Sequence, residues 1–341
     1  MKIYKSKIIN IVVLFIVTAL VLYFSLKDNF FEIINQILTM NPLFFILAIV
    51  FLFIYYIFNS YIMKLFVNKV NKKYTFKSSF RLQLMTQFFN AITPFSSGGQ
   101  PFQVYYLRKD GVRITDSTNI LIQNFITYQL ALIILGTVAI ISNKFFNIFP
   151  EVGVLKKLVL IGYLVNAIVV FVLFFVSFNK KSDKAIIKFI IKILNKLKIV
   201  KNEEDALKKW DNYINDFHKG ANKLFDDKKL FIKAIVLNIL SLISLYIIPL
   251  IILFGFNDFT SMNGAVTIVA SAYVMLIGAF VPIPGATGGI EYSFIAFYGN
   301  FIKGSTLNAV MLLWRLITYY FGMIIGAIVI NIKERKWNVW E

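Results

Sequence analysis

The sequence contains no cysteine and a single histidine, His218. The absence of cysteine excludes disulfides and thiolate chemistry. With His218 as the only histidine, a histidine-built metal site and a Ser-His catalytic triad are excluded as well. The sequence also lacks a Walker-type phosphate loop and a nucleotide-binding fold. No metal, no cofactor and no nucleotide-driven chemistry is therefore expected, and no catalytic residue can be assigned.

Long apolar runs dominate what is present. Apolar residues make up 58% of the chain, phenylalanine alone contributes 36 residues, and the mean hydropathy is +0.73. These values are typical of integral membrane proteins. A helix needs about 20 apolar residues to cross a hydrocarbon layer of about 30 Å. Runs of this kind predict six membrane-spanning helices, at residues 8–26, 43–66, 117–142, 156–178, 231–256 and 307–330.

Basic residues outnumber acidic ones by 36 to 17, which gives a formal net charge of +19. They cluster in segments between the predicted spans, chiefly at 69–81, 108–113, 180–233 and 333–336. Basic loops stay on the cytoplasmic side of a membrane and attract anionic lipid headgroups. Both termini are therefore expected in the cytoplasm. Nucleic acid is not an expected partner, because the sequence contains no basic soluble module.

Two further apolar segments, 80–108 and 264–302, are interrupted by proline, glycine and hydroxyl residues. The first contains PFSSGG at 94–99, and the second contains PGATGG at 284–289, about 190 residues later. Each segment is expected to form a broken helical hairpin that enters and leaves the membrane on the same side. The length of 264–281 leaves open the alternative that this stretch spans the membrane by itself.

The similarity between the halves extends past the breaks, since residues 117–136 resemble residues 305–326 in their Ser-Thr start, their Ile-Thr-Tyr and their closing glycine. Two such halves in opposite orientation are the signature of an inverted-topology repeat. The predicted fold is an all-α polytopic membrane protein with two inverted-topology repeats, six full spans and two facing re-entrant or broken helical hairpins. The expected boundaries are 1–142 for the first repeat with its hairpin at 80–108, 143–178 for the start of the second repeat, 179–230 for a cytoplasmic amphipathic insertion, and 231–341 for the rest of the second repeat with its hairpin at 264–302.

The insertion is too short to be a substantial catalytic domain. Apolar residues recur at helical spacing between 186 and 197, with lysines at other positions, which predicts a basic amphipathic helix on the inner leaflet. A second helix, partly solvated, is expected at 203–225. It carries His218, for which a solvated or packed surface position is favoured over a functional one.

The broken hairpins are the candidate site. Non-helical backbone at membrane depth survives only when it is buried in protein or lines a wet cavity. Glycine pairs let the backbone approach a ligand closely, and a helix that begins after the break directs its N–H groups toward an anion. Two facing hairpins would therefore suit an anionic group such as a lipid phosphate. The alternative is that the glycines only permit tight helix packing.

Two charged residues sharpen this hypothesis. Glu291 follows the second glycine pair, and Arg315 lies in the last predicted span. A charge at this depth costs about 2.5–3.5 kcal/mol or more unless it is paired or hydrated. We expect the two to face each other or a shared polar cavity; the alternative is a purely structural ion pair. Gln100 and Asn124 are their approximate counterparts in the first half, and further uncharged polarity is expected from Gln83, Gln87, Asn90 and Gln123.

The expected substrate-binding residues are Ser96, Ser97, Gly98, Gly99, Gln100, Thr287, Gly288, Gly289, Glu291 and Arg315, with Arg108 and Asn124 as further headgroup contacts. In this hypothesis Arg315 meets the phosphate, and Glu291 orients Arg315, contacts an amine or carries a proton.

On these glycine-rich hairpins, with Gln100-Pro101 after the first and Pro282-x-Pro284 and Glu291 in the second, the chain resembles the lysylphosphatidylglycerol synthase transmembrane-region family. This is the flippase-like domain of the bacterial multiple peptide resistance factor, an antibiotic-resistance protein. The resemblance implies a multi-pass protein of the bacterial cytoplasmic membrane that moves phospholipids or polyprenyl-phosphate lipids between leaflets. In full-length relatives a soluble domain transfers an amino acid to phosphatidylglycerol. The chain ends at Glu341 soon after the last predicted span, so a stand-alone member without that domain, and not an enzyme, is expected.

Two rival hypotheses remain. The chain could be the membrane subunit of a lipid-modifying enzyme whose catalytic domain is on another chain, or a membrane scaffold without transport. The expected partners are membrane lipids, either an anionic phospholipid or a polyprenyl phosphate, together with such an enzyme in the first rival. The sequence leaves the lipid, the direction of movement, the coupling ion and the oligomeric state undetermined.

Overall fold

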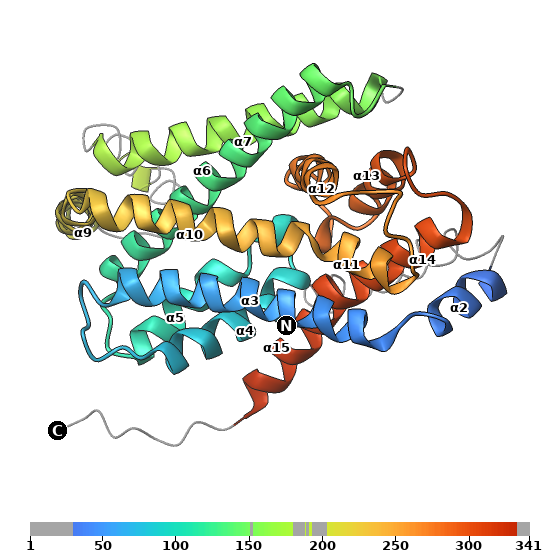
Figure 1. The fold of residues 1–341 in the computed structure, drawn as a ribbon. Helices are drawn as coiled ribbons and strands as arrows, with labels where there is room; N and C mark the ends of the chain where they lie inside the picture. Colours follow the sequence, from blue (N-terminus) through green and yellow to red (C-terminus); the bar gives the residue numbers. More distant parts are fainter. Residues whose placement is uncertain (1–29, 151–152, 180–187, 189–190, 193–202, 333–341) are drawn as a thin grey trace.

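The computed structural model describes residues 30–150, 153–179, 188, 191–192 and 203–332, and the regular secondary structure of these residues is helical, with no strand (Figure 1). The α-helices are α2 (Phe30–Leu38), α3 (Pro42–Val67), α4 (Phe76–Ala91), α5 (Gly99–Lys109), α6 (Ile114–Phe146), α7 (Gly153–Phe178), α9 (Glu203–Phe225), α10 (Lys228–Tyr246), α11 (Ile248–Gly255), α12 (Gly264–Gly278), α13 (Gly289–Tyr298), α14 (Gly304–Arg315) and α15 (Gly322–Asn331). Two short 3₁₀ turns, η1 (Pro94–Ser96) and η2 (Pro284–Ala286), and a π-helical stretch, η3 (Leu316–Phe321), complete the set.

Five helical segments of the described residues are long and apolar enough to cross a membrane, at Pro42–Val67, Ile114–Phe146, Gly153–Phe175, Lys228–Gly255 and Gly304–Asn331. They confirm five of the six predicted spans and show that the chain is a multi-pass membrane protein. The remaining prediction, 8–26, lies outside the described residues.

Both interrupted segments form helical hairpins. The helices α4 and α5 pack against each other on either side of η1, and α12 and α13 do the same on either side of η2. With 15 residues, α12 is about 22 Å long at 1.5 Å per residue, which is short of the hydrocarbon thickness of about 30 Å. The stretch 264–281 therefore does not span by itself: the chain turns back after Gly278 and returns as α13.

The helices α3 and α10 lie side by side and run antiparallel. Lys69, just after α3, forms an ion pair with Asp227, which caps the start of α10. The hydrogen bond from Lys69, together with one from the Leu230 N–H, holds the pKa of Asp227 below its usual value. The second predicted spans of the two halves, α3 and α10, thus run in opposite directions, as an inverted repeat requires; the repeat as a whole stays a prediction.

The second helix of the insertion, α9, matches the bounds expected for it and packs on α6. Two amides one helical turn apart on α6 hold it there. Asn119 donates to the carbonyl of Phe217 at 3.0 Å, and Gln123 donates to the carbonyl of Ala221 at 3.2 Å. Gln123 therefore fastens the insertion and does not add polarity near the hairpins.

His218 is packed within this contact. Its side chain is buried, and Nδ1 lies 3.0 Å from the carbonyl oxygen of Ser177 on α7. The favoured interpretation, a packed histidine, agrees with this position. The amphipathic helix predicted at 186–197 falls almost entirely outside the described residues.

Candidate functional site

The two breaks have the same backbone conformation at positions 190 residues apart. Phe95 and Ser96 in η1 have φ angles of 54° and 51°, and Gly285 and Ala286 in η2 have φ angles of 64° and 52°. Three of these four residues are not glycine, and left-handed backbone is uncommon for such residues. Strained backbone of this kind persists only where the surrounding structure enforces it, and it concentrates at functional sites.

The proline and hydroxyl residues of each break serve this turn. Ser97 Oγ donates to the carbonyl of Pro94 at 2.9 Å, and Thr287 Oγ1 donates to the carbonyl of Pro284 at 2.9 Å. Each of these carbonyls also accepts from the backbone N–H of the same residue, Ser97 at 3.2 Å and Thr287 at 3.4 Å, so the hydroxyl adds a second hydrogen bond across the turn. The Pro-x-x-Ser/Thr pattern in both halves is therefore first a means of closing the turn.

The glycines of the first break are held by the chain itself. The N–H of Gly98 donates to Thr93 Oγ1 at 2.8 Å, and the N–H of Gly99 donates to Asn90 Oδ1 at 3.0 Å. A Cβ on Gly98 would lie 2.5 Å from the Thr93 side chain, which is too close for any substituent. These N–H groups are thus occupied within the protein, and the glycines permit the close approach.

The second break has the same property. The N–H of Gly288 donates to Glu291 Oε2 at 2.6 Å, so the start of α13 is capped by its own carboxylate. A Cβ on Gly289 would lie 2.6 Å from Val281 Cγ2. Tight packing, the alternative interpretation of the glycine pairs, accounts for Gly98, Gly99 and Gly289. Nothing lies near a Cβ on Gly288, whose φ of 90° is the reason for glycine there.

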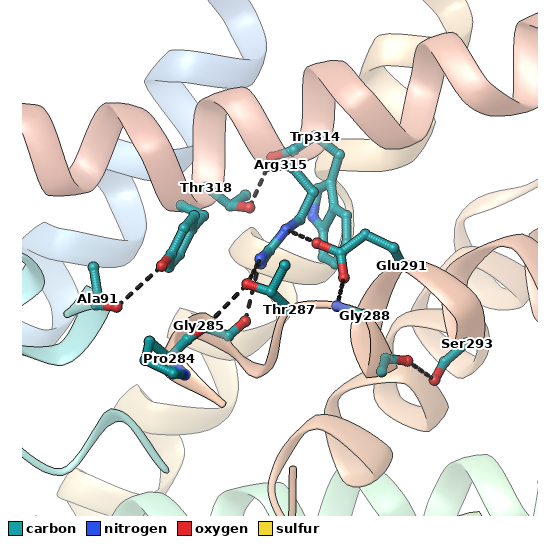
Figure 2. A network of polar contacts seen from close by, with 12 residues as sticks. Ala91, Pro284, Gly285, Thr287, Gly288, Glu291, Ser293, Trp314, Arg315 and Thr318 are labelled. Atoms are coloured by element: carbon teal, nitrogen blue, oxygen red, sulfur yellow. Dashed lines mark hydrogen bonds and ion pairs between the residues drawn. The ribbon is translucent and has the colours of Figure 1, made fainter. Parts of the chain in front are cut away.

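Glu291 and Arg315 meet, as shown in Figure 2. Glu291 Oε1 lies 2.7 Å from Arg315 Nε, and the two residues are only 5% and 6% exposed. Arg315 Nη2 donates to the carbonyl of Gly285 at 3.2 Å and to Thr287 Oγ1 at 3.3 Å. The guanidinium is therefore fixed by a carboxylate on one edge and by the second break on another.

Tyr319 connects the two breaks through the same arginine. The guanidinium carbon of Arg315 lies 4.4 Å from the centre of the Tyr319 ring, and the Tyr319 hydroxyl donates to the carbonyl of Ala91 at 3.0 Å. Tyr319 belongs to η3, and π-helical stretches are often found at functional sites. Since η1 and η2 also pack against each other, the hairpins meet at one place, next to Arg315.

A cavity of about 670 Å³ opens beside this junction, and we call it the central cavity. Much of its surface is uncharged but polar, and the side-chain amides that line it are Asn59, Gln83, Gln87, Asn90, Gln100, Gln103, Asn124, Gln129 and Asn166. Among the described residues of the lining, Arg315 is the only charged one. Its third nitrogen, Nη1, has no hydrogen bond with any residue that the structure describes. The central cavity therefore offers one cationic edge surrounded by neutral hydrogen-bonding groups.

The structure divides the expected site residues into three groups. Five line the central cavity: Ser96, Ser97, Gln100, Asn124 and Arg315. Six lie behind the lining in the two breaks: Gly98, Gly99, Thr287, Gly288, Gly289 and Glu291. Arg108 is exposed in the last turn of α5 and does not line the cavity.

Several lining residues were not anticipated from the sequence, namely Tyr55, Asn59, Gln103, Tyr128, Gln129 and Asn166. A signal for some of them was present, because Asn59, Gln129 and Asn166 are amides inside predicted spans, where polar side chains are costly and mark functional surfaces. Among the described residues no three His, Asp or Glu side chains are placed to hold a metal ion.

Comparison with known proteins gives a consistent result. Residues 8–326 match the family described as "Lysylphosphatidylglycerol synthase TM region". A UPF0104 membrane protein of Archaeoglobus fulgidus is 25% identical over 95% of this chain and 95% of its own length. The UPF0104 membrane protein MJ1595 of Methanocaldococcus jannaschii is also 25% identical, over 98% of this chain and 97% of its own length.

Proposed function

Because the chain belongs to the lysylphosphatidylglycerol synthase transmembrane-region family, we propose that it moves anionic phospholipids or polyprenyl-phosphate lipids between the leaflets of a membrane. The observation that carries this proposal is the central cavity, whose described lining has Arg315 as its one charge among neutral amides. A phosphate group needs a cationic partner and several hydrogen-bond donors, and arginine presents both in a fixed geometry.

In this proposal the phosphate contacts Nη1 of Arg315, the edge that no described residue occupies. Gln100 and Asn124 face the same cavity and can donate to the other headgroup oxygens. Glu291 does not face the cavity; its two oxygens hold Arg315 and the Gly288 N–H. Glu291 is thus a positioning residue, and its charge keeps the arginine from being an uncompensated buried cation when no lipid is bound.

The same pairing suits a transporter, because a site that must release its ligand cannot bind it too tightly. A carboxylate beside Arg315 weakens the net attraction for an anion while leaving one edge free. Outward movement of an anionic lipid across an inside-negative membrane is favoured by about 2.3 kcal/mol per charge per 100 mV. No nucleotide-driven step is therefore required for movement in that direction.

The membrane we propose is the cytoplasmic membrane, with both termini inside, because the basic segments gather at one end of the helices. The end of α3, the start of α10 and the insertion lie there together. Since the two relatives named above come from archaea, a bacterial source stays a prediction of the family resemblance. A role in antibiotic resistance is likewise only implied by that resemblance.

The enzyme-subunit hypothesis makes a different prediction. A lipid-modifying reaction needs an acid–base or nucleophilic set near the headgroup. The lining of the central cavity, as far as the structure describes it, contains no carboxylate and no histidine. This chain would then only hold the lipid for a partner, and purified protein alone would not move lipid between leaflets.

The test is lipid translocation by the purified full chain in proteoliposomes, with headgroup-labelled phosphatidylglycerol and a quencher that reaches only one leaflet. A labelled polyprenyl phosphate is measured in parallel. The double variant Glu291→Gln/Arg315→Gln removes both charges together and avoids an unpaired buried ion. Lys303→Gln, at an exposed loop position, is the matched control.

We expect movement of at least one of the two lipids by the wild type and by Lys303→Gln, and slow movement by the folded double variant. If the wild type moves neither lipid, the transport proposal is wrong and the result supports the enzyme-subunit hypothesis. Equal rates in the wild type and the double variant would reject Arg315 as the phosphate contact.

A further inference from the structure

A second, smaller cavity of about 330 Å³ lies between α6, α7 and α12, and we call it the second cavity. It is formed by the end of α6 and the start of α7, at the end of the molecule opposite the Lys69–Asp227 contact (Figure 1). Its lining residues are Ile140, Asn143, Lys144, Asn147, Lys156, Val159, Leu160 and Tyr273. The central cavity and its proposed function do not account for this site.

The charged residues among the described lining of the second cavity are both basic. Lys144 and Lys156 line it from two different helices, and neither ammonium has a hydrogen bond or an ion pair with any residue that the structure describes. Lys156 is only partly exposed, although it carries a charge. Two like charges that border one cavity repel each other, and a bound anion relieves this repulsion.

Neutral polar groups complete the lining. Asn143 is buried, and its side-chain Oδ1 accepts from the N–H of Phe149 at 2.9 Å, which fixes the side chain at the cavity. Asn147 caps α6 with left-handed backbone and also faces the cavity. Two amides beside two ammonium groups resemble the donor set expected for a phosphate oxygen cluster.

The second cavity lies on the same helices as the central cavity. Val165 and Asn166 line the central cavity, and Leu160 lines the second, so five to six residues of α7 separate them, about 8–9 Å at 1.5 Å per residue. On α12, Tyr273 lines the second cavity and Met275 lines the central one. The two cavities are therefore neighbours along the contact between α7 and α12.

Closely packed residues of α6, α7 and α12 lie between the segments of these helices that line the two cavities. Leu276 of α12 sits against two glycines: a Cβ on Gly136 would lie 3.2 Å from Leu276 Cδ1, and one on Gly162 would collide with the Leu276 carbonyl. Thr137 and Tyr163 join α6 to α7 at the same level through a contact of 2.9 Å between their hydroxyls. The two glycines let α6 and α7 pack closely around Leu276 of α12.

We propose that the second cavity is an anion site for a phosphate headgroup at the membrane face opposite the basic end, with Lys144 and Lys156 as its cationic contacts. The proposal rests on the proposed function and extends it. A headgroup that leaves the central cavity along the contact between α7 and α12 would reach these lysines next. A lipid phosphate and a free phosphate share the chemistry that the site recognises.

The experiment uses the full chain in proteoliposomes and phosphatidylglycerol with a photoreactive diazirine on its headgroup. Labelled peptides are mapped by mass spectrometry in two windows, 138–161 for the second cavity and 83–103 for the central cavity. The test variant is Lys144→Gln/Lys156→Gln. Lys157→Gln is the matched control, because Lys157 is exposed on the same turn and does not line the cavity. Lys144→Arg/Lys156→Arg keeps the charge and should restore labelling.

We expect labelling of 138–161 in the wild type and in Lys157→Gln, and a fall of about tenfold in Lys144→Gln/Lys156→Gln, as the loss of charge-assisted hydrogen bonds implies. Labelling of 83–103 should not change. No labelling of 138–161 in the wild type, or equal labelling in the test variant, would overturn the proposal.

Two further arms separate the remaining cases. Labelling of 138–161 that millimolar inorganic phosphate suppresses assigns the site to a free anion, and labelling that resists it assigns the site to the lipid. The translocation rate is measured on the same vesicles. Lysine-dependent labelling without translocation would leave the second site standing and reject the transport function, whereas translocation without such labelling would do the reverse.

Discussion

The two broken hairpins have the same turn and differ in what they present to the central cavity. In both, a proline begins the turn, two residues take left-handed backbone, and a hydroxyl closes onto the proline carbonyl. The first hairpin then contributes neutral side chains to the cavity, such as Ser96 and Gln100. The second instead holds Arg315 in place at the cavity, through the carbonyl of Gly285 and through Glu291, which lies behind the lining.

The difference shows how two hairpins with the same turn can give an asymmetric site. The turn itself needs only proline, a hydroxyl and residues that tolerate positive φ, so both halves keep it. The buried charges of the site, Glu291 and Arg315, both belong to the second half of the chain. There the pair finds its hydrogen-bond partners in the second break. A second cation facing the first across the cavity would raise the affinity for an anion and slow its release.

The largest expected effect comes from breaking the ion pair on one side. Arg315→Gln leaves Glu291 as an unpaired buried carboxylate, which costs about 3–5 kcal/mol of folding free energy. Thermal unfolding followed by tryptophan fluorescence in detergent should show a large fall in Tm. The double variant Glu291→Gln/Arg315→Gln should recover most of this stability but not lipid translocation. If Arg315→Gln is as stable as the wild type, the pair does not have the energetic role that we assign to it.

The next effect concerns Gly285, which in the second turn occupies the position that Phe95 has in the first. Gly285→Ala places a Cβ against the Tyr319 ring at a φ of 64°. Left-handed backbone costs about 1–2 kcal/mol and overpacking about 1–3 kcal/mol, so we expect a loss of about 2–5 kcal/mol. Gly288→Ala is the control, because its φ is 90° but nothing lies near the added Cβ. A loss no larger than that of the control would show that Tyr319 yields easily.

A smaller effect tests the uncharged half. Gln100→Glu adds a negative charge to the lining of the central cavity, and a like charge about 10 Å from a bound phosphate costs about 1–2 kcal/mol at an effective dielectric constant near 20. Translocation of phosphatidylglycerol should slow by about tenfold, while the neutral Gln100→Met should change it little. If both variants move the lipid at the same rate, the headgroup does not pass near Gln100.

The smallest expected effect concerns the link between the hairpins. Tyr319→Phe removes the hydrogen bond to the carbonyl of Ala91 and keeps the ring over Arg315. One such bond contributes about 1 kcal/mol, so Tm should fall slightly. Hydrogen exchange should rise in η1 and at the end of α4, and a change confined to α14 would contradict the proposed link.

The sequence predicted the hairpins, five of the spans and the Glu291–Arg315 pair, because long apolar runs, proline-glycine breaks and rare buried charges are strong local signals. It predicted only some of the polar groups that face the cavity, among them Ser96, Gln100 and Asn124. Gln123 points to α9, whereas Asn166 and Gln129 face the cavity, and only the packing of α6 and α7 decides this. The glycine N–H groups were expected to face a ligand, yet Asn90, Thr93 and Glu291 occupy them.

The most direct test of the central claim, that an anionic headgroup binds in the central cavity at Arg315, uses the absence of cysteine. Ser96→Cys places the only thiol of the chain in the lining of that cavity. Its rate of reaction with a water-soluble thiol reagent is measured in nanodiscs of neutral lipid with increasing phosphatidylglycerol. We predict that phosphatidylglycerol protects the thiol, and that Glu291→Gln/Arg315→Gln abolishes the protection. Equal reaction rates at all lipid compositions, or protection that survives in the variant, would contradict the claim.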